Sequence, residues 1–265
     1  MSKHQALDTF GRSGNPIIRS SAFQETSTSG ERMTLEGAVN KTGILLFLTV
    51  LSAAVSWNFT GSFMSLVSTI GVFTGIIAAI STFGFYFFFI GWIVEPRPHL
   101  APKTGPIYAI GMGFMIGLIS EQAEAMFPGI VIQAVSLTFF VAASLLIAYK
   151  TGIIRPTQNF VLMIFAATLG IFLTYLFSFI FSLITGSSFS MFTDESGYTS
   201  WMSIGISLFV VAIAALNLVL DFDIIEQADE QGAPKYMEWF GAMALMATLI
   251  WLYIEILRLL MKLRR

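Results

Sequence analysis

Seven long apolar stretches, separated by short polar segments, account for most of the chain. An apolar stretch of about 18 or more residues can cross the roughly 30 Å hydrocarbon core of a membrane as a helix. The pattern therefore predicts an all-α integral membrane protein, a bundle of seven transmembrane helices. The expected spans are residues 43–57 (with an alternative start near Leu35), 65–94, 106–125, 130–149, 160–184, 201–220 (continuing as helix to about Asp229) and 239–260.

Proline and glycine mark the expected helix ends. Pro106 is predicted in the first turn of the third span, where a helix does not need the amide hydrogen that proline lacks. Pro128-Gly129 predicts a tight turn between the third and fourth spans. Residues 232–234, Gly-Ala-Pro, predict the break between the last two spans.

Two glycine pairs have the GxxxG spacing that lets two helices approach closely. They are Gly71 with Gly75, and Gly113 with Gly117. This spacing fits both a packing surface within the bundle and the face of a homodimer. Packing within the bundle is the interpretation we favour.

Composition limits the domain organisation and the kinds of site. The 265 residues are 55% hydrophobic and 11% charged, so seven spans leave no room for a second soluble domain. Residues 1–32 are polar and are predicted to be a disordered N-terminal tail, and residues 33–265 the transmembrane domain. There is no cysteine, and His4 and His99 both lie outside the spans. Thiolate chemistry, disulfides and an intramembrane histidine metal site are therefore excluded.

Charge and motifs argue against a nucleic-acid partner and against an enzyme. The formal net charge is -2, and no basic stripe with interleaved aromatic residues is present. No HExxH or GxGD motif occurs, and a lysine inside the last span, as a retinal protein needs, is also missing. We therefore expect no enzymatic activity and no cofactor.

The distribution of lysine and arginine predicts the orientation in the membrane. An N-terminus in the cytoplasm places most cations before residue 236 on the inner side, as the positive-inside rule requires. The loop before the sixth span carries Asp194 and Glu195 and no cation, which fits the outer side. Four C-terminal cations conflict with this topology: Arg258, Lys262, Arg264 and Arg265. Either the last span crosses completely, which we favour, or it turns back.

Asp221 is the strongest candidate for a functional residue. It lies about 12 residues before Ala233, and Thr248 lies about 15 after it, which is roughly 18 and 22 Å of helix. The two side chains should therefore lie at similar depth on neighbouring helices. A carboxylate at such depth costs about 2.5 to 3.5 kcal/mol unless it is neutral, paired or hydrated. We expect Asp221 to point into the bundle, whereas Asp223 and Glu226, three residues apart, share another face nearer the cytoplasm.

A second acidic group is expected near the outer face. Glu121 and Glu124 lie about 22 to 27 Å along the third span, and Glu255 lies at a similar height on the last one. They predict an acidic outer mouth. An alternative stays open for two of them: Glu255 can form an intrahelical ion pair with Arg258, three residues away, and have no further role, and Glu124 can simply be solvated.

The last two spans and the turn between them contain three segments of a recognisable pattern: LVLDFDII at residues 218–225, PKYMEW at 234–239 and LYIEILR at 252–258. Together with Gln133-Ala134 and Thr138-Phe139 in the fourth span, these segments resemble the Bax inhibitor-1 family, in particular its bacterial branch. The resemblance covers about residue 33 to the C-terminus. The resemblance implies seven helices, one of them wrapped by six, and a pH-sensitive calcium leak.

The resemblance also implies a proton-sensitive element, which in that family is a pair of aspartates, one on each of the last two helices. Asp221 matches the first aspartate, and Thr248 stands at the position of the second. The chain therefore lacks the pair of carboxylates that would share a proton at these two positions, although a route for cations can survive.

Two functions follow as hypotheses. The first is a calcium leak in the cell membrane, the inner membrane of a bacterium, in which Asp221 transiently accepts a cation or proton. Asp223, Glu226, Thr248 and Glu255 would belong to the path, and Glu121 and Glu124 to its outer mouth. Its partners are then the lipid bilayer and calcium ions. The alternative is an integral membrane regulator that binds another membrane protein, such as a protease, through its N-terminal tail.

Overall fold

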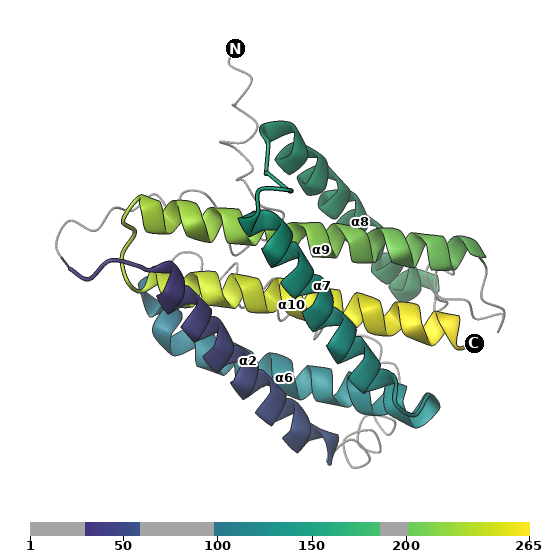
Figure 1. Ribbon diagram of the computed structural model, residues 1–265. Coiled ribbons are helices and arrows are strands. Elements are labelled where there is room, and N and C mark those ends of the chain that lie inside the picture. Colours follow the sequence, from purple (N-terminus) through teal and green to yellow (C-terminus); the bar gives the residue numbers. More distant parts are fainter. Residues whose placement is uncertain (1–29, 59–97, 186–200) are drawn as a thin grey trace. The chain divides into compact units, whose positions relative to one another are not determined.

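The computed structural model describes residues 30–58, 98–185 and 201–265, and within them the fold is all-helical (Figure 1). The predicted second span, the loop with Asp194 and Glu195, and most of the predicted tail lie outside these ranges. The helices are α2 (Leu35–Trp57), α6 (Ala101–Met126), α7 (Ile130–Lys150), α8 (Gln158–Thr185), α9 (Trp201–Glu230) and α10 (Met237–Leu263), with the short 3-10 helix η4 (Pro98–Leu100) before α6.

Five of the six described α-helices are long and apolar enough to cross a membrane: α2, α7, α8, α9 and α10. The sixth, α6, has the length for a crossing but carries Lys103 near its start and Glu121 and Glu124 near its end. The described part of the chain is therefore an all-α, multi-pass membrane protein. The count of seven helices stays a prediction, because residues 65–94 are outside the described ranges.

Most helix boundaries match the sequence prediction, and one differs. The first span begins at its alternative start, Leu35, where the Thr34 side chain accepts a hydrogen bond from the amide of Gly37 and caps the helix. In α6, Pro106 is inside the helix, which begins at Ala101 rather than at Pro106. One missing amide hydrogen bond near the start of a helix is tolerated, and the preceding η4 turn supports the earlier beginning.

Glycines in the left-handed region end α6 and α9. Gly129 has φ +80° in the turn before α7, and Gly232 has φ +70° in the turn before α10. Residues with a Cβ rarely adopt this conformation, so these positions favour glycine. Both breaks fall where the sequence predicts them.

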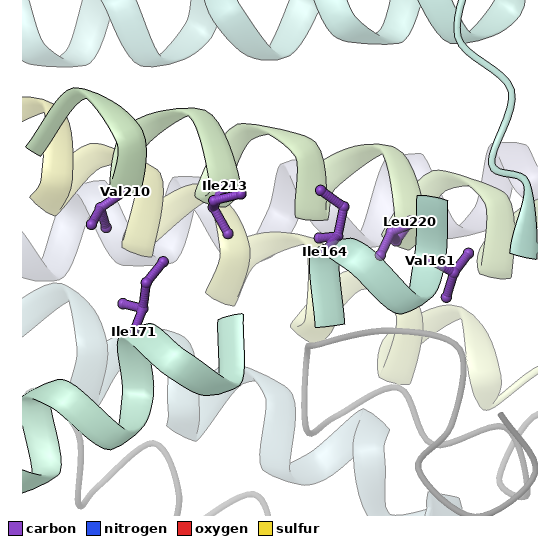
Figure 2. Packing of buried hydrophobic residues seen from close by; sticks show 6 residues of the cluster. All are labelled: Val161, Ile164, Ile171, Val210, Ile213 and Leu220. Carbon is purple, nitrogen blue, oxygen red and sulfur yellow. The ribbon is translucent and has the colours of Figure 1, made fainter. Parts of the chain in front are cut away.

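The described residues form two compact units. The first unit contains α7, α8, α9 up to Asp223 and α10 from Ala247 onward. In its core, α8 packs against α9 through six buried aliphatic side chains (Figure 2). These are Val161, Ile164 and Ile171 of α8, with Val210, Ile213 and Leu220 of α9.

The second unit contains α2, α6 up to Ala125 and the turn between α9 and α10 (residues 224–246). Gly113 and Gly117 of α6 face α2 so closely that a Cβ at either position would overlap α2 backbone atoms of Thr49 or Ala53. The Ser52 hydroxyl donates to the Ile110 carbonyl at 2.7 Å across the same contact. Packing within the bundle is therefore confirmed for this GxxxG pair; Gly71 and Gly75 lie outside the described residues.

Candidate functional site

Asp221 and Thr248 form a buried hydrogen bond between α9 and α10. The Thr248 hydroxyl donates to Oδ2 of Asp221 at 2.6 Å, and the residues are 0% and 3% exposed. Both helices continue without interruption past these positions, and the two side chains meet as their similar distances from the turn predicted. The predicted inward orientation of Asp221 is confirmed.

Asn217 is a second buried polar residue, one helical turn before Asp221 on α9. Its Nδ2 donates to the Ile213 carbonyl and to the Thr168 hydroxyl of α8, each at 2.9 Å. Both partners lie within the apolar contact between α8 and α9. Sequence reasoning missed Asn217, although an asparagine four residues before a buried carboxylate, inside an apolar span, was a usable signal.

Glu255 lies at the centre of a polar cluster on α10 and α8. Arg258 contacts both of its carboxylate oxygens at 3.0 Å, so the intrahelical ion pair predicted from the spacing is confirmed. The Tyr175 hydroxyl of α8 and the Trp251 indole also donate to Glu255, at 3.0 and 3.3 Å. The guanidinium of Arg258 also lies 5.4 Å from the Tyr175 ring centroid. Arg258 thus offsets the charge of Glu255 at close range.

The C-terminal end of α10 contacts the beginning of α9 and the turn before α7. Lys262 donates to the Ser203 carbonyl and to the Ser207 hydroxyl of α9, the latter at 2.9 Å. Arg264 donates to the Pro128 carbonyl at 3.0 Å and to the Gln133 side chain at 2.8 Å. From Ala247 onward, α10 therefore runs antiparallel to α9 and does not turn back.

Asp223 and Glu226, the other α9 carboxylates in the predicted path, have different environments. Asp223 is half-buried and accepts a hydrogen bond from the Tyr149 hydroxyl of α7 at 3.3 Å. Glu226 is exposed. Neither is sequestered as Asp221 is, and their membership of an ion path stays a prediction.

Glu121 and Glu124, predicted as an outer acidic mouth, lie near the end of α6 and are half-buried. They belong to the second unit, whereas Glu255 belongs to the first. Their role also stays a prediction.

Two carboxylates that sequence reasoning did not select hold the start of α2 to the turn between α9 and α10. Glu238 is 2% exposed and accepts from both the amide and the hydroxyl of Thr34 at 3.1 Å. Its other oxygen lies 3.7 Å from Nζ of Lys41. Asp229 accepts from the amide of Leu35 at 3.2 Å. They satisfy amides that the beginning of a helix leaves without internal partners.

Residues 31–33 extend this attachment along the same turn. Arg32 forms an antiparallel bridge with Pro234, and the amide of Met33 donates to the Ala233 carbonyl at 2.7 Å. Glu31 forms an exposed ion pair with Lys235. Lys235 lowers the pKa of Glu31, and Glu31 raises the pKa of Lys235. The contacts of this unit thus begin before residue 33, the predicted start of the transmembrane domain.

In the described part of the chain, no three His, Cys, Asp or Glu side chains gather where they could hold a metal ion. Asp221, the residue predicted to contact a cation transiently, accepts the hydrogen bond from Thr248, and Asn217 lies one helical turn before it on α9. Its contact with a cation stays a prediction.

Comparison with known proteins gives one family. The model of the family described as Bax inhibitor 1 like matches residues 15–265, which include every residue that the structure describes. Neither a curated protein nor a solved structure matches the chain.

Proposed function

The chain belongs to the Bax inhibitor 1 like family, and from this premise we propose that it is a membrane leak for cations, calcium above all, in which Asp221 is the charged group of the path. The single observation that carries the proposal is the buried Asp221–Thr248 hydrogen bond. It joins the two helices that bury the largest share of their residues among the five candidate spans.

The choice of a cation follows from the chemistry of this contact. A hydroxyl is neutral, so Thr248 stabilises the Asp221 carboxylate without cancelling its charge. Calcium is a hard ion that prefers carboxylate, carbonyl and water oxygens. A single buried carboxylate attracts such an ion and holds it too weakly to store it, as permeation requires.

The contact also indicates how the leak is closed. Asp221 is 0% exposed, so in this conformation bulk water does not reach its carboxylate. Conduction then requires α9 and α10 to separate enough to break the Thr248–Asp221 hydrogen bond. Protonation of Asp221 would remove its attraction for a cation, which is the pH sensitivity that this proposal includes.

The cluster around Glu255 has a different role in the proposal. Arg258 contacts both carboxylate oxygens of Glu255. The Glu255 carboxylate therefore attracts other cations much less than a buried carboxylate without a basic partner would. We assign Glu255 to the packing of α10 against α8 rather than to cation binding. Cations would be concentrated by Asp223, Glu121 and Glu124, which are partly accessible, and by Glu226, which is exposed.

The proposed location is the cell membrane, the inner membrane in a bacterium, with the N-terminus in the cytoplasm. The distribution of lysine and arginine supports this orientation. The C-terminal cations then lie on the outer side, because α10 does not turn back. An impermeant thiol reagent would test this directly on a variant with one cysteine added after Arg265, since the chain has no cysteine of its own.

The function is tested by reconstituting the purified chain in liposomes that contain a calcium indicator. Calcium entry above that of protein-free liposomes is expected, and entry equal to theirs would overturn the proposal. Deleting residues 1–29 separates this function from the alternative, a regulator that docks through its tail. The deletion leaves Glu31 and its ion pair with Lys235 in place, so the leak should persist.

A further inference from the structure

The amide of Asn217 has a fixed orientation. Its Nδ2 lies 2.9 Å from the Ile213 carbonyl, which can only accept a hydrogen bond, so the amino group rather than the oxygen must face it. The second hydrogen of Nδ2 goes to the Thr168 hydroxyl. Both donors of the side chain are therefore used within the contact between α8 and α9.

The oxygen of the same amide, Oδ1, is buried and has no hydrogen-bond donor among the described residues. Asn217 is 1% exposed. The core between α8 and α9 is made of aliphatic side chains, among them Ile164, Ile213 and Leu220, which offer no side-chain donor (Figure 2). A buried carbonyl oxygen without a donor costs free energy and asks for an explanation.

The place of Asn217 on α9 connects this oxygen with Asp221. Two residues that are four positions apart on an α-helix are separated by about 6 Å along the axis and point in directions about 40° apart. Asn217 and Asp221 are therefore adjacent on one face of α9, and Thr248 of α10 contacts the second of them. Asn217 borders both the contact with α8 and the contact with α10.

We propose that Oδ1 of Asn217 is a further ligand for the cation that Asp221 attracts, so that a calcium ion meets a carboxylate and an amide oxygen one turn apart. This inference rests on the proposed function. Calcium takes about six to eight oxygen ligands and accepts amide carbonyls alongside carboxylates and water. An amide oxygen replaces one water of hydration without adding charge, which favours passage over retention.

The test uses terbium(III), a hard cation that takes the same oxygen ligands and whose luminescence is sensitised by a nearby tryptophan. Trp251 lies three residues from Thr248 on α10, about one turn away. The full chain in detergent is titrated with terbium, and calcium is then added as competitor. Asn217→Leu should raise the half-saturating terbium concentration at least about tenfold, as loss of a ligand or its support does at metal sites.

The matched control is Thr168→Val, which removes the partner of Nδ2 but leaves Oδ1 in place. It should weaken terbium binding clearly less than Asn217→Leu does, because the Ile213 carbonyl still fixes the orientation of the amide. Equal losses for Thr168→Val and Asn217→Leu would show a purely structural role and overturn the inference. So would unchanged terbium affinity in Asn217→Leu. If Asn217→Leu does not fold, Asn217→Asp, which keeps an oxygen, must bind terbium at least as tightly as the wild type.

The same variants separate this inference from the proposed function. Absence of calcium flux in wild-type liposomes overturns the leak whatever terbium does. Flux that depends on Asp221 while terbium affinity is indifferent to Asn217 overturns the ligand assignment alone.

Discussion

The hydroxyl of Thr248 lies 2.6 Å from Oδ2 of Asp221 and forms a buried hydrogen bond between α9 and α10. Because both residues are almost completely buried, the contact contributes to stability, and in the proposed function it would also hold the leak closed. Separate measurements can resolve these two contributions.

Replacing Thr248 by valine, which has nearly the same shape but no hydroxyl, should destabilise the chain by about 1 to 3 kcal/mol, because a buried acceptor loses its donor. The same change should raise resting calcium flux, since the proposed function has this contact hold the leak closed. Thr248→Ser keeps the donor and is the control. Thermal unfolding in detergent and flux in liposomes are the measurements, and identical behaviour of the two variants would contradict the assignment.

The Glu255–Arg258 pair should stabilise the first unit, and the loss of one charge should cost more stability when the opposite charge is left behind. Removing one partner of a fully buried pair costs about 3 to 5 kcal/mol, and we expect less for Arg258→Gln because its side chain is 32% exposed. Glu255→Gln combined with Arg258→Gln should be more stable than Arg258→Gln alone. Unfolding of the two single variants and the double variant measures this coupling, and additive losses would show that the charges do not interact.

Gly113 should not tolerate alanine, because a Cβ there overlaps the backbone oxygen of Thr49 and α2 must move away from α6. A loss of about 1 to 3 kcal/mol is expected for such overpacking. Gly43→Ala is the control, since nothing lies within 4 Å of a Cβ at that exposed position of α2. If thermal unfolding finds the two variants equally stable, the close contact between α2 and α6 is wrong.

The ion pair of Glu31 with Lys235 should hold residues 31–33 to the turn between α9 and α10 only within a window of pH. The pKa of Glu31 is lowered, so its contribution is complete above its ordinary value of 4.5 and is lost as pH falls through the lowered value. The pKa of Lys235 is raised, so its contribution is complete below 10.5 and is lost as pH rises through the raised value.

Hydrogen exchange of the Met33 and Lys235 amides, which donate to Ala233 and Glu31, reports this attachment. At neutral pH, exchange should be faster in Lys235→Gln than in the wild type, by a modest factor that added salt reduces, because the pair is exposed. At a pH below the lowered value for Glu31 the two should exchange alike. A difference that persists in acid would mean that Lys235 acts through packing instead.

The sequence was sufficient to predict the described helices and the position of Asp221 opposite Thr248, because apolar length and a constant rise per residue determine both. It was not sufficient for Asn217, Glu238 and Asp229. Their roles depend on which side chain or amide of another helix lies opposite, and periodicity along one helix does not contain that information. Pro106 was misplaced because the third apolar stretch begins later than its helix does.

The most direct test of the account is calcium flux through liposomes that hold equal amounts of wild-type chain, Asp221→Asn or Glu230→Gln. Glu230 is an exposed carboxylate at the end of the same helix and serves as the matched control. The account predicts that Asp221→Asn loses most of the flux while Glu230→Gln keeps it. Flux through Asp221→Asn equal to that of the wild type would contradict the central claim that this buried carboxylate is the charged group of the path.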